Sequence, residues 1–362
     1  MTLSNDKSTP QISVILAVYN GEDLLREAID SILNQTFTNF ELIIVNDGST
    51  DRTPEIISSY EDERIVALNN EPNLGLPKSL NKAIRFSQGD FIAINDHDDI
   101  SDQKRLERQL ECILKNPELS LVATSAMIID EAGRKIGFKA MPSTESQTRL
   151  EFLFNNPVIH SSVLMNKEVA LKLGCYDESL IPGCDYELWS RMIRSGYKIT
   201  FLKEPLIYFR VVGGSLTESK RANIDKYIKE LAIIVRKNIS SFINMDLSEE
   251  EVEGLCKILN CPHTLNLKEL ENATHLFNLI LNRFPEEVSE LNREKELKKT
   301  IAKFKYLLAI ANIEKNVLST ARKELIESIR LYPYRIKPVI YYLLTFLGYR
   351  SIKFTRMLKG KN

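Results

Sequence analysis

The sequence lacks the features that would place a protein in a specialised class. No apolar run reaches the ~20 residues that a membrane-spanning helix needs, and the first residues, MTLSNDKSTP, contain no secretory signal. The net charge of −1 gives no electrostatic argument for a nucleic-acid partner. The five cysteines are scattered without CxxC spacing, which argues against a zinc site and favours a reducing compartment. We therefore expect a cytoplasmic protein.

What remains is an ordinary globular composition, 43% hydrophobic and 27% charged. The first hundred residues alternate short apolar, β-branched runs with stretches whose apolar residues recur at helical spacing. This alternation predicts an α/β domain with a mostly parallel sheet flanked by helices. The runs that we expect to form its strands are 12–18, 40–45, 64–68 and 90–94.

Three of these predicted strands end in polar residues. The polar segments are YNG at 19–21, NDGS at 46–49 and NDHDD at 95–99. In open parallel sheets, ligands bind outside the carboxyl ends of the strands. We therefore expect the three segments to meet at one rim and to form the functional site.

The acidic segment 96–99, with sequence DHDD, has two interpretations. Carboxylate oxygens suit Mg²⁺ or Mn²⁺, and such ions are held by one or two carboxylates together with substrate phosphates. In the alternative, the segment is a solvated turn in which Asp99 or Ser101 caps the next helix. The spacing does not fit an EF-hand loop.

The NDGST segment is less specific. Asp47 is either a hydrogen-bond acceptor for a nucleotide base or part of a common Asp-Gly turn. A helix is expected to follow, with Thr53 as its cap and Pro54 in its first turn.

Taken together, these motifs resemble family 2 glycosyltransferases of the GT-A fold. The matching runs are ISVILAVYNGEDLLREAIDSILNQTFTNFELIIVNDGSTDRT, NEPNLGLPKSLNKAIRFSQGDFIAINDHDDI, PVIHSSVLM and CDYELWSRMIRSGYK. They cover roughly residues 11 to 215, and several linked motifs are far more specific than any single one. We predict a GT-A catalytic domain over 1–215 and a mostly helical region over 216–362.

The resemblance implies roles for individual residues. The nucleotide-sugar donor would be bound by Ala17, Tyr19, Glu22, Asp47, Lys78, Asp96 and His97. Asp98 would bind the metal, Mn²⁺ or Mg²⁺, and Asp185 would be the catalytic base. Asp185 has a structural alternative as a helix N-cap, and both roles can hold at once.

The sequence departs from the family pattern at three places. Cys184 stands where many relatives have glutamate, and Asn46 replaces an aspartate. Gly213 and Gly214 follow Arg210 where many relatives carry a histidine. The run VIHSSVLM at 158–165 is expected to form a further strand. We interpret His160 as a partly buried histidine of this strand rather than a ligand, although the resemblance places it near the acceptor.

The C-terminal region is predicted to be helical, with 300–333 typical of one tetratricopeptide-like helix pair. No acidic residue follows Glu327, whereas basic residues flank the apolar, aromatic segment 338–349. That segment is too short to span a bilayer. It either lies at an anionic membrane surface or packs on the neighbouring helices.

We therefore expect a metal-dependent, inverting glycosyltransferase of the hexosyl or N-acetylhexosaminyl type. It would be non-processive, since the QxxRW-type motif of processive synthases is missing. The donor would be a UDP-sugar, and a glycan or lipid-linked acceptor would serve cell-surface polysaccharide assembly at the inner face of a membrane. A catalytically inactive nucleotide-sugar-binding scaffold or sensor is the main alternative. A nucleotidyltransferase is weaker, because YNGEDLL lacks the Gly- and basic-rich loop of that class.

Overall fold

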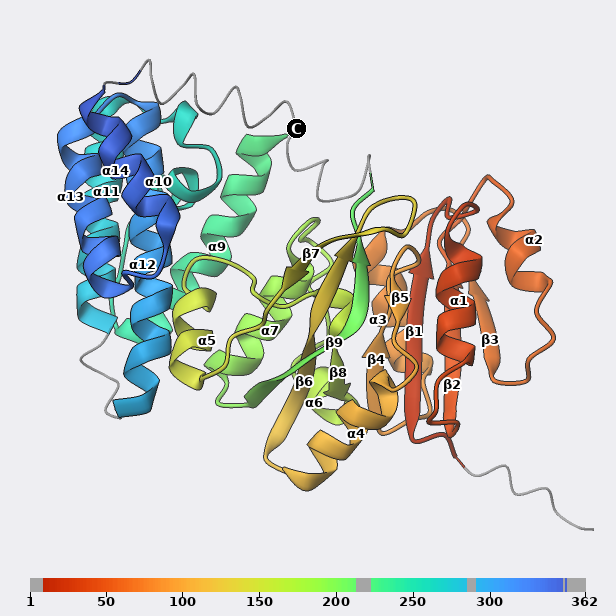
Figure 1. Cartoon of the computed structure of the whole chain (residues 1–362). Coiled ribbons are helices and arrows are strands. Elements are labelled where there is room, and N and C mark those ends of the chain that lie inside the picture. The colour runs from red at the N-terminus through yellow and green to blue at the C-terminus, as the bar shows by residue number, and fades with distance from the viewer. Residues whose placement is uncertain (1–8, 213–222, 285–290, 348, 350–362) are drawn as a thin grey trace, which may run out of the picture. The chain divides into compact units, whose positions relative to one another are not determined.

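The computed structural model describes residues 9–212, 223–284, 291–347 and 349 (Figure 1). The chain forms two compact units, one of Met1–Met141 and Asn156–Ala222, the other of Pro142–Asn155 and Asn223–Asn362. The segment 142–155, which the sequence analysis assigned to the catalytic domain, thus belongs to the helical unit. Two contacts with residues distant in the sequence hold the segment in that unit. Lys303 Nζ donates to the Glu151 carboxylate at 2.9 Å, and the Asn238 side-chain amide donates to the Phe152 carbonyl.

The described part of the first unit contains a sheet in the order β3-β2-β1-β4-β8-β6-β9-β5, with β7 paired to β6. The strands β3, β2, β1 and β4 are parallel neighbours, which confirms the predicted alternation over the first hundred residues. Beyond β4 the sheet is mixed, since β8 runs antiparallel to β4 and β6 while β6 and β9 are parallel. The strands are β1 Ile12–Val18, β2 Phe40–Asn46, β3 Ile65–Asn69, β4 Phe91–Ile94, β5 Ile100–Ser101, β6 Leu119–Ile129, β7 Lys135–Lys139, β8 Leu164–Asn166 and β9 Lys198–Arg210.

Helices cover this sheet because each presents an apolar face at helical spacing. In α1, for example, Leu25, Ala28, Ile29 and Ile32 are buried against the core that β1 and β2 supply. The helices of this unit that the structure describes are α1 Leu25–Leu33, α2 Thr53–Ser58, α3 Leu76–Phe86, α4 Arg105–Lys115, α6 Lys167–Lys172 and α7 Cys184–Arg194.

Two local predictions were wrong. Thr53 is the first residue of α2 rather than its cap, because its hydroxyl accepts a hydrogen bond from the Gly21 amide instead. The segment 158–165 is not one strand. His160–Ser162 form a 3₁₀ turn, closed by a bond from Ser162 N to Ile159 O, and β8 begins only at Leu164.

The described part of the second unit is helical throughout, as the sequence predicted. Its core includes an aromatic cluster in which the ring of Phe154 stacks on Phe277 at 4.3 Å and meets Phe304 edge-on. Ser248 and Asn266 begin two of its helices with capping boxes. None of the described helices is long and apolar enough to cross a bilayer. The helices are α5 Glu145–Phe152, α9 Ile224–Ile243, α10 Glu249–Asn260, α11 Leu267–Arg283, α12 Leu291–Glu314, α13 Leu318–Leu331 and α14 Ile336–Phe346.

Candidate active site

The carboxyl ends of β2, β1 and β4 are neighbours at one edge of the sheet. Val18 pairs with Asn46 at the end of β1 and β2, and Ile15 pairs with Ile94 at the end of β4. The polar segments that follow these strands therefore lie on the same rim, as parallel pairing requires.

Hydrogen bonds between backbone amides and side-chain oxygens connect the segment after β1 to the segment after β2. Asn20 N donates to Ser49 Oγ at 3.0 Å, and Thr50 N returns a bond to Asn20 Oδ1 at 2.8 Å. Glu22 takes part through its carboxylate, which accepts from Arg52 N at 3.0 Å. The side chain of Tyr19, the first residue after β1, is 47% exposed, so its ring is accessible for stacking on a ligand. Ala17, in contrast, is buried at the end of β1.

Asp47 is buried and both of its oxygens accept hydrogen bonds from the segment after β3. Oδ1 accepts from Asn70 Nδ2 at 2.8 Å and from Leu74 N at 2.9 Å, and Oδ2 accepts from Gly75 N at 2.9 Å. Gly48 follows at φ +73°, where a Cβ would come within 2.7 Å of the Asn73 nitrogen, so only glycine fits this turn. Lys78, at the start of α3, is exposed.

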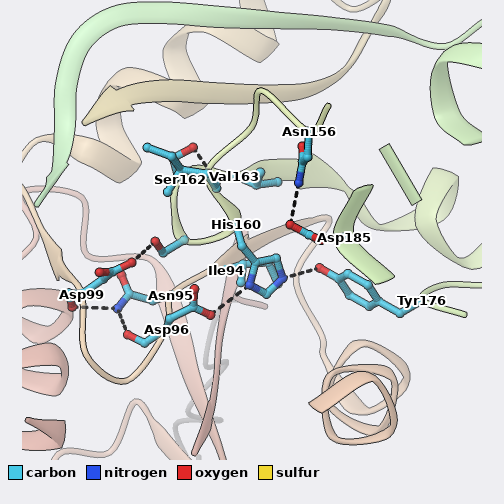
Figure 2. Close-up of polar contacts among 12 residues, drawn as sticks. Ile94, Asn95, Asp96, Asp99, Asn156, His160, Ser162, Val163, Tyr176 and Asp185 are labelled. Atoms are coloured by element: carbon cyan, nitrogen blue, oxygen red, sulfur yellow. Dashed lines mark hydrogen bonds and ion pairs between the residues drawn. The ribbon is translucent and has the colours of Figure 1, made fainter. Parts of the chain in front are cut away.

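The acidic turn after β4 is held from several sides (Figure 2). Asp99 is buried and accepts hydrogen bonds from the Ser161 hydroxyl and, at 2.7 Å, from Arg210 N. Burial and the neighbouring carboxylates of Asp96 and Asp98 raise the pKa of Asp99 well above its ordinary value. The predicted cap for the next helix is not formed by Asp99 or Ser101, since α4 begins at Arg105 with Lys104 as its cap.

A chain of three side chains links the acidic turn to the far side of the site. The Asp96 Oδ1–His160 Nδ1 distance is 2.9 Å, and the His160 Nε2–Tyr176 Oη distance is 3.0 Å (Figure 2). Burial by itself lowers the pKa of His160, but the Asp96 carboxylate and, more weakly, Asp185 reverse this, so the pKa lies above its usual value. Burial likewise opposes ionisation of Asp96, and His160 outweighs it, so the pKa of Asp96 is lowered.

The His97 ring lies against Gly21 in the segment after β1. A Cβ on Gly21 would come within 2.7 Å of the His97 ring, so the glycine allows the ring to contact the β1 segment directly. The interpretation of His160 as partly buried is confirmed, but it lies in a 3₁₀ turn rather than a strand.

Asp98 is half-buried, and among the described residues no other side chain donates a hydrogen bond to its carboxylate. Burial and the Asp96 charge raise its pKa, which is the electrostatic situation that a bound cation relieves. The described residues contain no cluster of three or more potential metal ligands. One carboxylate that is not bonded to other side chains fits Mg²⁺ or Mn²⁺, because these ions take their remaining ligands from water and phosphate.

Arg210 stabilises the backbone around this turn. Its Nε donates to the Asp98 carbonyl at 3.0 Å, Nη1 to the Glu131 carbonyl at 2.9 Å, and Nη2 to the Glu27 carboxylate at 2.5 Å. The side chain is 2% exposed, so its charge is committed to positioning the turn. Gly213 and Gly214, the predicted departure after this arginine, lie outside the described residues.

A second buried arginine lies beneath the turn. Arg105 is fully buried, and each of its five N–H groups has an acceptor in the described part of the unit. The acceptors are Gln109 Oε1, Asn95 Oδ1, Ser101 Oγ, Ile94 O and Val163 O. Through Ile94 and Val163 it holds the end of β4 against the turn that carries His160.

Asp185 lies in the first turn of α7, opposite the acidic turn. The N-cap of α7 is Gly183 at φ +120°, so the capping role considered for Asp185 is not observed. Instead, Asp185 Oδ2 accepts from Asn156 Nδ2 at 2.6 Å (Figure 2). Cys184 is buried beside it, and burial followed by the Asp185 charge raises the pKa of the thiol, which stays protonated.

Figure 2 shows His160 between Asp96 and Asp185. His160 interacts electrostatically with both carboxylates, and Asp98 interacts with Asp96. No sequence pattern indicated Asn156 or Tyr176, and none linked His160 to Asp96. Local sequence patterns carry little information about these contacts, because the partners are far apart along the chain. Asn156 and Asp185 are separated by 29 positions, His160 and Tyr176 by 16, and His160 and Asp96 by 64.

The model of the family described as glycosyl transferase family 2 matches residues 13–174. A glycosyltransferase of Methanocaldococcus jannaschii, named as uncharacterized, is 37% identical over 207 residues, which are 56% of this chain and 71% of that protein. The chain belongs to glycosyltransferase family 2. A second relative, the putative teichuronic acid biosynthesis glycosyltransferase TuaG of Bacillus subtilis, is 29% identical over 58% of this chain and 83% of its own.

The fold agrees with this family. The crystal structure of S. aureus TarS in complex with UDP-GlcNAc superposes with a TM-score of 0.57 at 17% identity, covering 90% of this chain and 93% of that one. The first unit of this glycosyltransferase accordingly has the predicted GT-A fold.

Proposed function

We propose that this glycosyltransferase moves a sugar from a UDP-sugar to a hydroxyl group of a glycan or lipid-linked acceptor in cell-surface polysaccharide assembly. The arrangement of Asp96 and Asp98 at the end of β4, with Asp185 across the site, carries the proposal. TarS, with the same fold, was solved with UDP-GlcNAc, and the name of TuaG refers to teichuronic acid biosynthesis. Both support a nucleotide-sugar donor and a polysaccharide product.

In the proposed donor site, Tyr19, Ala17 and Asp47 lie around the nucleobase, and Glu22 and Asp96 approach the ribose and diphosphate. His97 lines the same rim through its contact with Gly21. Lys78 is exposed at the start of α3, where a flexible ammonium can reach a phosphate. A Mg²⁺ or Mn²⁺ ion on Asp98 would neutralise charge on the leaving diphosphate.

Asp185 is the proposed general base. Its carboxylate takes the proton of the acceptor hydroxyl while the oxygen forms a bond to the anomeric carbon. The bond from that carbon to the diphosphate breaks in the same displacement, and the nucleoside diphosphate leaves. One displacement inverts the anomeric configuration, and one carboxylate is enough.

Calorimetry with UDP, GDP and dTDP, each with Mn²⁺ and with EDTA, tests the donor site. We expect UDP to bind only with the metal and Asp98→Ala to abolish that binding, while Asp23→Asn, an exposed aspartate of the same unit, leaves it intact. Tight Mn²⁺-dependent UDP binding by Asp98→Ala would disprove the metal assignment. Asp185→Asn should bind donor normally and lose transfer, and transfer at the wild-type rate would place the base elsewhere.

A nucleotide-sugar-binding scaffold is the second candidate, and Cys184 favours it. A buried, protonated thiol stands beside Asp185 where many relatives have an acidic residue. Donor binding without turnover on any acceptor would support this candidate, whereas release of free UDP in the presence of an acceptor would exclude it.

A further inference from the structure

The last helix that the structure describes has two apolar faces. On its inner face, Tyr341, Tyr342 and Leu344 pack against Ala309 and Ala321 of α12 and α13. Arg322 secures this face by donating to the Thr345 hydroxyl at 3.0 Å and to the Thr345 carbonyl at 2.8 Å. α14 is therefore anchored on one side, and its outer side faces away from that core (Figure 1).

The outer face of α14 is a continuous apolar stripe. Its members recur at intervals of three and four residues, so they share one side of the helix. They are exposed by 37% to 73%, and a contiguous exposed stripe of large apolar residues marks an interaction surface. The stripe consists of Ile336, Val339, Ile340, Leu343 and Leu347, whereas the Phe346 ring, although exposed, contacts Tyr342 and Arg322 of the inner face.

The C-terminal sequence that carries this stripe is basic. The sequence has no acidic residue beyond Glu327. Arg330 and Lys337 are exposed next to and on α14. Residues 350–362 lie outside the described part of the chain, but their sequence continues the pattern. The basic residues of the whole stretch are Arg330, Arg335, Lys337, Arg350, Lys353, Arg356, Lys359 and Lys361.

We infer that the outer face of α14 docks on an anionic lipid surface, with its axis in the plane of the membrane interface. An apolar stripe flanked by lysine and arginine is the composition that such surfaces bind. A second copy of the chain is a less favourable partner for this face. A symmetric contact between two copies would place their basic residues against each other, and like charges repel. At eleven residues the helix is about 16 Å long, too short to cross the ~30 Å hydrocarbon core.

The biological role of this docking rests on the proposed function, because membrane binding would bring the candidate active site to a lipid-linked acceptor. The two claims are measured separately. Mn²⁺-dependent UDP binding reports on the active site, and vesicle binding of the full chain reports on α14. A protein that fails to bind UDP could still bind vesicles, and a protein that fails to bind vesicles could still bind UDP.

The test is co-sedimentation of the full chain with vesicles of phosphatidylcholine alone and of an equal mixture with phosphatidylglycerol. We expect binding to the anionic vesicles only, weakened by high salt. Ile340→Glu with Leu343→Glu should weaken it about tenfold or more, because both charges enter the lipid-facing stripe. Leu279→Glu is the matched control, since Leu279 is 46% exposed on α11 in the same unit, and it should bind like the wild type.

Three results would overturn the inference. The first is equal binding to neutral and anionic vesicles, or to neither. The second is a dimer in light scattering that Leu343→Glu dissociates, which would make a second copy the occupant. The third is a loss of unfolding free energy in Leu343→Glu that deletion of 350–362 reproduces, which would show that the chain's own end covers the stripe.

Discussion

The side-chain amide of Asn156 donates to Oδ2 of Asp185 at 2.6 Å, and its own orientation is fixed because Val158 N donates to Asn156 Oδ1 at 3.1 Å. The NH₂ group therefore always faces the carboxylate. Asn156 is thus a positioning residue that holds the proposed base in one rotamer.

Replacing Asn156 should slow transfer without weakening donor binding. Asn156→Ala removes the hydrogen bond that orients the Asp185 carboxylate, so kcat should fall while the donor KM changes little. Asn156→Asp places a second carboxylate against Asp185 and should lower kcat further. Steady-state kinetics with the donor varied at a fixed acceptor concentration separate the two parameters. A wild-type kcat in Asn156→Ala would show that the contact is only structural.

Arg105 should be indispensable for stability although it touches no carboxylate. In Arg105→Lys, three ammonium donors replace five N–H groups, so at least two of the five buried acceptors lose their partner. We expect a loss of about 3 kcal/mol in the free energy of unfolding, measured by urea denaturation. Arg108→Lys, on the exposed side of the same helix, should cost about 1 kcal/mol or less. Equal losses in the two variants would contradict this account.

His160 should stabilise the fold most at low pH. Its pKa is raised in the folded state, so its contribution is complete below the unfolded value of about 6.5 and disappears as pH rises through the folded pKa. The difference in unfolding free energy between wild type and His160→Gln should therefore shrink with rising pH across that window. A difference that grows with pH would refute the Asp96 pairing.

The cysteines should differ sharply in reactivity. Burial raises the pKa of all five thiols, but only Cys112 is partly exposed, and the other four are buried. Titration of the native protein with a chromogenic disulfide reagent near neutral pH should show one accessible thiol. Cys112→Ser should remove it, and unfolding should release the rest. Rapid labelling of Cys184 in the folded protein would contradict its burial beside Asp185.

The sequence predicted correctly those elements whose own residues show a clear hydrophobic pattern. All seven residues of β1 are buried, and such an apolar, β-branched run can hardly be anything else. The spacing in α1 likewise identifies its buried face without knowledge of its partner. Parallel pairing then placed the polar ends of β1, β2 and β4 together, so the site's location followed from the strand order alone.

Sequence-based prediction failed where a residue's structure depends on a distant partner. The turn at His160–Ser162 replaces a predicted strand because Ser161 binds Asp99, 62 positions away. The segment 142–155 was assigned to the wrong neighbours because Glu151 pairs with Lys303, 152 positions away. No local pattern records such contacts, and the same reason hid the chain from Asp96 through His160 to Tyr176.

The bonds of Asp47 bear on how a donor would bind. In the proposed donor site, a nucleobase N–H would meet a carboxylate whose Oδ1 already accepts two hydrogen bonds, from Asn70 Nδ2 and Leu74 N, whereas Oδ2 accepts one, from Gly75 N. Since each carboxylate oxygen can accept two hydrogen bonds, Oδ2 keeps one position for the base. The segment after β3 orients this carboxylate before the donor arrives, so binding the base would cost little ordering of the side chain.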